Sequence, residues 1–222
     1  MRKTKRRLLY KKEMKEAIDI LLSLYPDSRS ELDFTNHLEL LVATILSAQC
    51  TDVRVNLVTP ALFSVAKTAR DYAEMDPKEL EGLIKTCGLY KSKAKNIQLT
   101  ARILDEEYGG EVPATREELM QLPGVGRKTA NVVLANAFGI PTFAVDTHVF
   151  RVSNRIGFAD AKTPDETEQQ LMRHLPEESW IGGHHALILH GRRVCKARAP
   201  LCETCPASSL CLFVKGKEPY RL

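Results

Sequence analysis

Apolar residues recur at helical spacing along most of this 222-residue chain, and no other feature restricts its fold as strongly. Met14, Ile18 and Leu21 lie three or four positions apart, so they share one face of a helix over residues 13–24. Residues 38–48 are almost continuously apolar and too long for a strand, which indicates a buried helix. The alternation and hairpin signals of strands are missing from the sequence. We therefore predict an all-α fold with short loops.

Capping residues mark the starts of further helices. Helices are expected to begin after Asp76, Thr115 and Thr163, because each of these side chains can accept a hydrogen bond from a first-turn N–H group. An amphipathic stretch at 91–108 predicts another helix, which the two following glycines should end. Most of the chain is therefore expected to be helical.

Positive charge is concentrated at the two ends of the chain. The net charge is +4, yet residues 1–12 carry seven Lys and Arg without an acid, and residues 191–222 carry seven against two Glu. Basic ends on an acidic middle favour a polyanionic partner, although the first ten residues fit a solvated tail equally well. No apolar run approaches the roughly 18 residues that span a membrane. We expect a cytoplasmic protein without a membrane span.

Cysteines close to the C-terminus have a spacing typical of a metal site. The pattern C-x6-C-x2-C-x5-C consists of Cys195, Cys202, Cys205 and Cys211. Such crowding in a cytoplasmic protein favours metal over disulfides. The uneven gaps favour an iron–sulfur cluster, and zinc is the alternative because its modules usually pair two short knuckles. The other two cysteines, Cys50 and Cys87, lie in helix-like segments and are predicted to be small core residues.

Two cations lie in the loop between the first two of these four cysteines. Metal ligands at both ends of the loop would hold Lys196 and Arg198 in place, so that little ordering entropy remains to be lost on contact with a phosphate. The alternative is that both are ordinary surface charges.

Residues 122–134, LPGVGRKTANVVL, predict a glycine turn that leads directly into a helix from about Arg127. We expect Gly124 and Gly126 to adopt positive φ and to turn backbone N–H groups outward. Together with the first N–H groups of the helix, they would bind one backbone phosphate of a nucleic acid. Taken alone, the pattern fits a plain tight turn between helices equally well.

LPGVGRKTANVVL resembles the helix–hairpin–helix of the endonuclease III family of DNA glycosylases. Other stretches resemble the same family in the same order: SAQCTDVR (47–54), GLYKSKAKNI (88–97), VDTHVFRVSNRIG (145–157) and the four-cysteine spacing. The resemblance extends from about residue 15 to residue 212.

The resemblance implies two closely docked helical domains that flank a DNA cleft. Residues 30–140 would form a six-helix barrel with the helix–hairpin–helix, and residues 1–29 with 141–222 would form an iron–sulfur cluster domain. It further implies a monomeric, nucleoid-associated base excision repair enzyme with a [4Fe-4S] cluster. The enzyme would act as a DNA glycosylase and AP lyase on double-stranded DNA that contains oxidised pyrimidines or abasic sites.

The resemblance also assigns Lys128 as the nucleophile and Asp146 as the catalytic carboxylate. A lysine amine can attack the anomeric carbon, expel the base and leave a Schiff base, after which β-elimination breaks the strand on its 3′ side. A carboxylate can accept the proton of the lysine or stabilise the positive charge that develops on the sugar. The alternatives are a solvated surface lysine and an aspartate that only caps a helix.

A base inside the duplex must be flipped out before it reaches the enzyme, and side chains fill the hole. By resemblance, Gln49 pairs with the orphaned partner base and Leu89 is pushed between base steps. Alternatively, Gln49 ends a helix and Leu89 belongs to the core. The resemblance places Arg127 and His148 against the DNA backbone or the lesion pocket.

Two other functions compete with this interpretation. An adenine glycosylase of the same superfamily would carry a catalytic Glu where this chain has Ile45, and it usually lacks the hairpin lysine. A non-catalytic DNA-binding metal module would have no need of Lys128 and Asp146. Both alternatives are therefore weaker than a pyrimidine-lesion enzyme with lyase activity.

Overall fold

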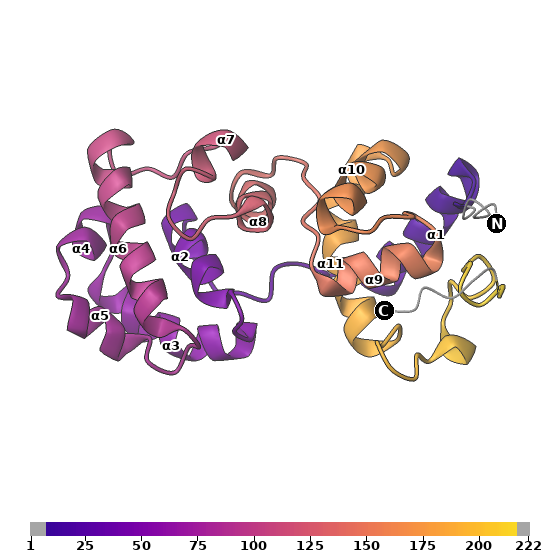
Figure 1. Ribbon diagram of the computed structural model, residues 1–222, viewed down its shortest axis with the longest axis horizontal. Coiled ribbons are helices and arrows are strands. Elements are labelled where there is room, and N and C mark those ends of the chain that lie inside the picture. Colours follow the sequence, from indigo (N-terminus) through magenta and orange to yellow (C-terminus); the bar gives the residue numbers. More distant parts are fainter. Residues whose placement is uncertain (1–7, 217–222) are drawn as a thin grey trace. The chain divides into compact units, whose positions relative to one another are not determined.

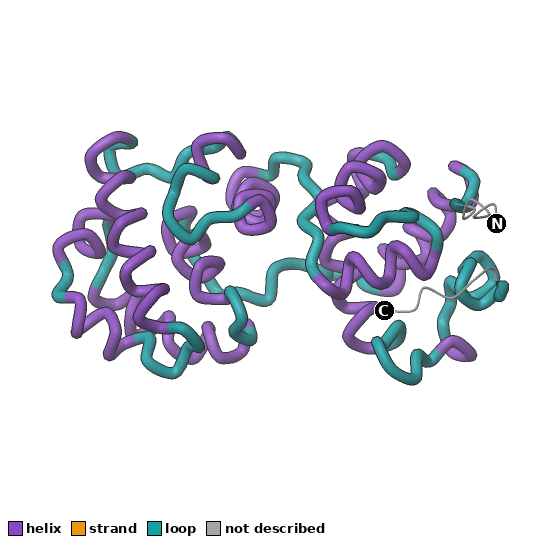
Figure 2. The backbone as a smooth tube through the Cα atoms, in the orientation of Figure 1, coloured by secondary structure: helices purple, strands orange, loops and turns teal. Residues whose placement is uncertain are grey.

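The structure is a computed structural model that describes residues 8–216, and over this range it contains helices and loops without a strand (Figures 1 and 2). The prediction of an all-α fold is confirmed. Most of the basic N-terminal segment lies outside the described residues. The chain divides into two compact units, one from Ser30–Ile140 and one from the described parts of Met1–Arg29 and Pro141–Leu222. Among the helices described, none has the length and apolar character needed to cross a membrane.

The Ser30–Ile140 unit is built around one buried helix. Its helices are α2 (His37–Ser47), α3 (Asp52–Val65), α4 (Ala69–Glu74), α5 (Pro77–Leu83), α6 (Tyr90–Glu107), α7 (Arg116–Leu119) and α8 (Arg127–Phe138). Every residue of α2 from Glu39 to Leu46 is buried, and α2 packs against α3, α6 and α8. The almost continuous apolar run predicted this burial, because a helix that is apolar all round needs neighbours on every side.

Capping residues begin these helices, and the predicted caps Asp76 and Thr115 are confirmed, as is Thr163 at the start of α10 (Pro164–His174) in the other unit. Asn36 Oδ1 accepts a hydrogen bond from Glu39 N at 2.9 Å and starts α2. Asp76 Oδ1 accepts from the N–H group of Lys78 at 2.7 Å and starts α5, and Thr115 starts α7. The helix expected after Thr115 is a short one, since α7 has only four residues.

The other unit joins the N-terminal helix to the C-terminal part of the chain. Its helices are α1 (Lys11–Leu24), α9 (Thr147–Ile156), α10 (Pro164–His174) and α11 (Trp180–Arg193), with 3-10 turns at Glu177–Ser179 and Cys202–Thr204. Helix α1, drawn in indigo in Figure 1, packs against α11, and α9 packs against both α10 and α11. Ile18 of α1 is fully buried in one core with Phe143 and Phe158. This shared core explains why the unit is discontinuous in sequence.

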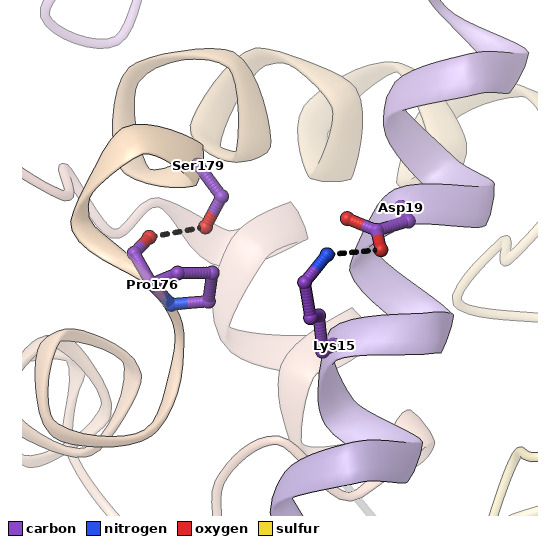
Figure 3. A network of polar contacts seen from close by, with 4 residues as sticks. All are labelled: Lys15, Asp19, Pro176 and Ser179. Atoms are coloured by element: carbon purple, nitrogen blue, oxygen red, sulfur yellow. Dashed lines mark hydrogen bonds and ion pairs between the residues drawn. The ribbon is translucent and has the colours of Figure 1, made fainter.

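Short polar contacts stabilise the surface of this unit (Figure 3). Lys15 Nζ donates to Asp19 Oδ2 at 2.6 Å, one helical turn along α1, and both side chains are exposed, so solvent screens the pair. Ser179 Oγ donates to the carbonyl oxygen of Pro176 at 2.6 Å and closes the turn that precedes α11. The exposed ion pair therefore adds little to the free energy of unfolding.

Both ends of the described chain are hydrogen-bonded to the end of α9. Leu9 N donates to the carbonyl oxygen of Gly157 at 3.0 Å, and Leu212 N donates to that of Ile156 at 3.1 Å. Gly157 ends α9 with a φ of 105°, and a Cβ at this position would lie 2.5 Å from Leu212 Cδ1. The left-handed backbone and the close approach both require glycine here.

The turn between α7 and α8 uses its two glycines differently. Gly124 has a φ of 82°, and a Cβ there would lie 2.9 Å from Asn96 Nδ2. Gly126 has a φ of −90°, and a Cβ there would meet no atom within 4 Å. The expectation of positive φ is therefore confirmed for Gly124 and wrong for Gly126, which is extended because it serves as the N-cap of α8. Thr100 Oγ1 donates to the carbonyl oxygen of Pro123 at 2.9 Å and holds the turn against α6.

We predict that alanine is tolerated unequally at these two positions. Gly124→Ala should lower the free energy of unfolding by about 2 kcal/mol, because the left-handed backbone and the contact with Asn96 both oppose a Cβ. Gly126→Ala should cost less than about 1 kcal/mol, the usual difference between glycine and alanine at an N-cap. Urea denaturation of both variants beside the wild type measures this. Equal losses would contradict the geometry described for the turn.

Candidate functional site

Lys128 lies at an uncapped helix start. It is the second residue of α8, its side chain is exposed, and N-cap Gly126 offers no side chain to the first-turn N–H groups. The first hydrogen bond of the helix runs from Ala130 N to the carbonyl oxygen of Gly126 at 2.9 Å. The N–H groups before it have no carbonyl within the helix, so an anion placed here would meet backbone donors and the positive end of the helix dipole. Arg127, the first residue of α8, is partly buried.

Gln49 and Leu89 lie on two loops that touch. Gln49 follows α2 and Leu89 directly precedes α6, and a Cβ on the neighbouring Gly88 would lie 3.4 Å from the carbonyl oxygen of Gln49. Both residues are in the left-handed region, with φ of 53° for Gln49 and 59° for Leu89. Such backbone costs about 1–3 kcal/mol in a residue other than glycine, and it is concentrated at functional sites.

Both side chains are presented to solvent. Leu89 is 60% exposed, so the alternative that it belongs to the core is wrong. Gln49 is also exposed and lies after the C-cap of α2, so it does not end the helix. A large apolar side chain held outward in a strained conformation is unusual on a solvated surface, and it is compatible with insertion into a ligand.

Cys50 and Cys87 lie on the same two loops. Cys87 is buried in the core of the unit, as predicted, while Cys50 is half-buried and packs against that core. The expectation that both lie in helical segments is wrong, because α2 ends at Ser47 and α5 ends at Leu83.

Asp146 is the N-cap of α9. Its Oδ1 accepts a hydrogen bond from Val149 N at 2.7 Å, and the side chain is partly buried. This contact confirms a capping role, and it leaves Oδ2 for a second partner. The structure thus places Asp146 at the start of α9 in one unit and Lys128 at the start of α8 in the other.

His148 is a residue of α9, and its side chain lies close to Gly191 of α11. Its Nδ1 lies 3.2 Å from Arg151 Nη2, and a Cβ on Gly191 would lie 2.9 Å from the Cβ of His148. Burial lowers the pKa of His148 below its usual value, and nearby Asp146 acts in the opposite direction. The ring is therefore mainly neutral at pH 7.

Arginines on α9 hold the segment that begins at Cys195. Arg151 Nε donates to the carbonyl oxygen of Cys195 at 3.1 Å, and its Nη2 donates to that of Gly191 at 2.9 Å. Arg155 donates to the carbonyl oxygens of Lys196 at 2.7 Å and Ala197 at 2.9 Å. Sequence reasoning missed both arginines. Their spacing of four on a helix was visible, but their carbonyl partners lie about forty residues away.

The four cysteines of the C-terminal pattern line one cavity. Arg155, His190 and Phe213 also line it, together with apolar residues such as Ile156 and Val194. Arg155 Nη1 lies 3.7 Å from Cys195 Sγ, and His190 Nε2 lies 3.5 Å from Cys205 Sγ. Within residues 8–216, no three His, Cys, Asp or Glu side chains are arranged as ligands of a single metal ion.

Burial makes these thiols reluctant to ionise without a cation. It raises the pKa of Cys202, Cys205 and Cys211, and the neighbouring thiols of the group raise it further. The Arg155 cation acts in the opposite direction on Cys202. Since metals bind thiolates, a positively charged group in the cavity would supply the missing compensation. The donor set therefore fits a thiolate-held metal group.

Lys196 and Arg198 are exposed on the loop between Cys195 and Cys202. The loop is held by the two carbonyl bonds from Arg155 and by Leu201 N, which donates to the carbonyl oxygen of Val194 at 3.0 Å. These hydrogen bonds hold the loop against α9 and Val194, while the side chains of Lys196 and Arg198 are exposed.

Known proteins share both the sequence and the fold. Residues 42–177 match the family model of HhH-GPD superfamily base excision DNA repair proteins. The chain is 50% identical over 205 residues to endonuclease III of Bacillus subtilis (strain 168), which covers 92% of this chain and 94% of that protein. It is 51% identical over 188 residues to endonuclease III of Escherichia coli (strain K12), with 85% and 89% covered.

A solved structure of endonuclease III trapped in a covalent intermediate with DNA superposes with a TM-score of 0.88 and 48% identity, covering 94% of this chain and 98% of that one. Fold, sequence and the family model thus agree over most of the chain. The chain belongs to the endonuclease III family within the HhH-GPD superfamily, and it is a DNA glycosylase and AP lyase of base excision repair.

Proposed function

We propose that the enzyme removes oxidised pyrimidines from double-stranded DNA and then cleaves the strand, through a Schiff base on Lys128. The observation that carries this proposal is the position of Lys128, an exposed amine at the uncapped start of α8 directly after the glycine turn. The same turn offers backbone donors to a phosphate, so the strand and the nucleophile would meet at one place.

The reaction proceeds in two steps. The free amine of Lys128 attacks C1′ of the damaged nucleotide, the bond from C1′ to the base breaks, and the base leaves with a proton. The C1′–O4′ bond then opens and O4′ takes up a proton, which leaves an iminium between Lys128 Nζ and C1′ that acidifies the hydrogen on C2′. Loss of that proton then expels the 3′ phosphate by β-elimination. In this scheme Asp146, whose Oδ2 is not needed by the cap, accepts the proton of the lysine and stabilises positive charge on the sugar.

Gln49 and Leu89 are assigned to the flipping step. The exposed amide of Gln49 pairs with the base left without a partner, and the outward Leu89 side chain enters the stack. Their loops touch, which would bring the two side chains to one place on the duplex. The buried Ile45 at the position of the adenine-glycosylase carboxylate is consistent with a lysine-based mechanism.

The remaining candidates are assigned to the DNA backbone. The turn of Gly124 and Gly126, with Arg127, receives one phosphate at the start of α8. The exposed cations Lys196 and Arg198 contact phosphates from the ordered loop. The half-buried His148, being mainly neutral, serves as a hydrogen-bonding group rather than as a cation.

Each compact unit has its own role in this proposal. Residues 30–140 form the domain with the helix–hairpin–helix, and residues 1–29 with 141–222 form the iron–sulfur cluster domain. The four cysteines around one cavity would hold a [4Fe-4S] cluster, which anchors the C-terminal segment when bound. Zinc is the alternative occupant. The enzyme is proposed to act as a monomer on nucleoid DNA in the cytoplasm.

Lys128→Ala should abolish the borohydride-trapped adduct with duplex DNA that contains an abasic site. Strand cleavage should fall by at least about a thousandfold, because the nucleophile is lost. Affinity for the duplex should change far less, since one cation among many contributes little to binding. Lys67→Ala, which removes an exposed lysine elsewhere in the same unit, is the control. A trapped adduct that persists in Lys128→Ala would refute the assignment.

Cys202→Ser should remove the iron, the acid-labile sulfide and the broad visible absorption of the purified protein. The free energy of unfolding or the DNA affinity should fall, while the single-turnover rate of base release should stay nearly unchanged. The reason is that the cysteines order the loop of Lys196 and Arg198 and take no part in the chemical step. Cys50→Ser should leave the iron content unchanged.

Elemental analysis and single-turnover base release decide these points. A colourless wild type with stoichiometric zinc would rule out the iron–sulfur cluster. A collapse of single-turnover base release in Cys202→Ser, with normal folding and binding, would contradict the anchoring role.

A further inference from the structure

Cys50 and Cys87 bring two thiols together outside the four-cysteine cavity. Cys50 directly follows Gln49, and Cys87 lies two residues before Leu89, so each thiol is on one of the two touching loops. Cys87 lies in the core of the Ser30–Ile140 unit, and the half-buried Cys50 packs against the same core. The closest approach of the loop backbones lies beside them, where a Cβ on Gly88 would be 3.4 Å from the carbonyl oxygen of Gln49.

The two thiols differ in access. Cys50 is half-buried, whereas Cys87 is 1% exposed. Burial, together with the neighbouring Cys50, raises the pKa of Cys87 to about 11, although the nearby cations Lys93 and Arg54 act in the opposite direction. A reagent from solvent therefore meets Cys50 first, and Cys87 is placed to react only with a sulfur already attached to Cys50.

We propose that Cys50 and Cys87 form a reversible disulfide, made by exchange with a small-molecule disulfide, that joins the two loops. The Cys50 thiolate attacks one sulfur of the reagent and releases the first thiol. The Cys87 thiolate then attacks Cys50 Sγ and releases the second thiol. The two cysteines lose two protons and two electrons, and the reagent is reduced to two thiols.

The consequence for catalysis rests on the proposed function. If Gln49 and Leu89 enter the duplex, their loops must adjust to the DNA as the base leaves the stack. A covalent bond between the loops prevents any change in their spacing. The disulfide therefore slows base release, and a thiol reductant restores it.

Oxidised glutathione is the probe for the site itself. After treatment of the iron-loaded protein, digestion without reductant should yield a peptide pair joined through Cys50 and Cys87, two hydrogens lighter than the separate peptides. Cys87→Ser should instead retain glutathione on Cys50, because the second step is lost. Cys50→Ser should leave Cys87 unmodified. Unchanged iron content shows that the four cluster cysteines did not react.

Two results would overturn the disulfide. One is a wild type in which glutathione stays on Cys50 while Cys87 remains a thiol, and the other is a wild type in which neither cysteine reacts. The first result would mean that the two sulfurs do not reach bonding distance, and the second that the reagent does not reach Cys50.

The effect on catalysis is measured as the single-turnover rate of base release from a duplex with one oxidised pyrimidine. The oxidised wild type should be at least fivefold slower than the reduced wild type and recover with dithiothreitol, while the rate of Cys50→Ser should not respond to oxidised glutathione. A joined peptide pair with an unchanged rate would refute the restraint on the loops. A reduced enzyme without base release would refute the proposed function instead, and the peptide map would still decide the disulfide.

Discussion

Helix α9 is the element on which the cysteine-bearing unit depends. Its end accepts hydrogen bonds from Leu9 on one side and from Leu212 on the other, so it connects the two ends of the described chain. Arg151 and Arg155 on its side donate to the carbonyl oxygens of the segment that starts at Cys195. Its start is capped by Asp146. A single helix thus fixes the proposed catalytic carboxylate and the frame of the proposed cluster, because both are hydrogen-bonded to it directly.

In the Ser30–Ile140 unit, the proposed DNA-binding residues are positioned by turns with left-handed backbone. Gln49, Leu89 and Gly124 have φ of 53°, 59° and 82°, and each lies at a turn next to a helix. Only Gly124 adopts this conformation without a steric cost. At Gln49 and Leu89 the backbone is strained while the side chain faces solvent, which is expected where a ligand rather than the protein core uses the side chain.

Helices and their starts could be predicted from the sequence because their causes are local. Apolar spacing and a capping residue such as Asp76 act within a few positions, and the resemblance supplied the candidate residues. The backbone of the loops could not be predicted in this way. Gly124 and Gly126 look alike in sequence, yet only the first has positive φ, because the second begins a helix. The close approach of the loops that carry Cys50 and Cys87, which are far apart in sequence, becomes visible only in the folded chain.

The central claim is that Lys128 forms the covalent bond with DNA. Peptide mapping of the wild-type adduct, reduced with borohydride after reaction with an abasic duplex, tests this claim most directly, because it identifies the modified atom without a mutation. If Lys128 is the nucleophile, a single modified peptide is expected, with the sugar remnant on Lys128 Nζ. A remnant on another lysine or on the N-terminal amine would contradict it.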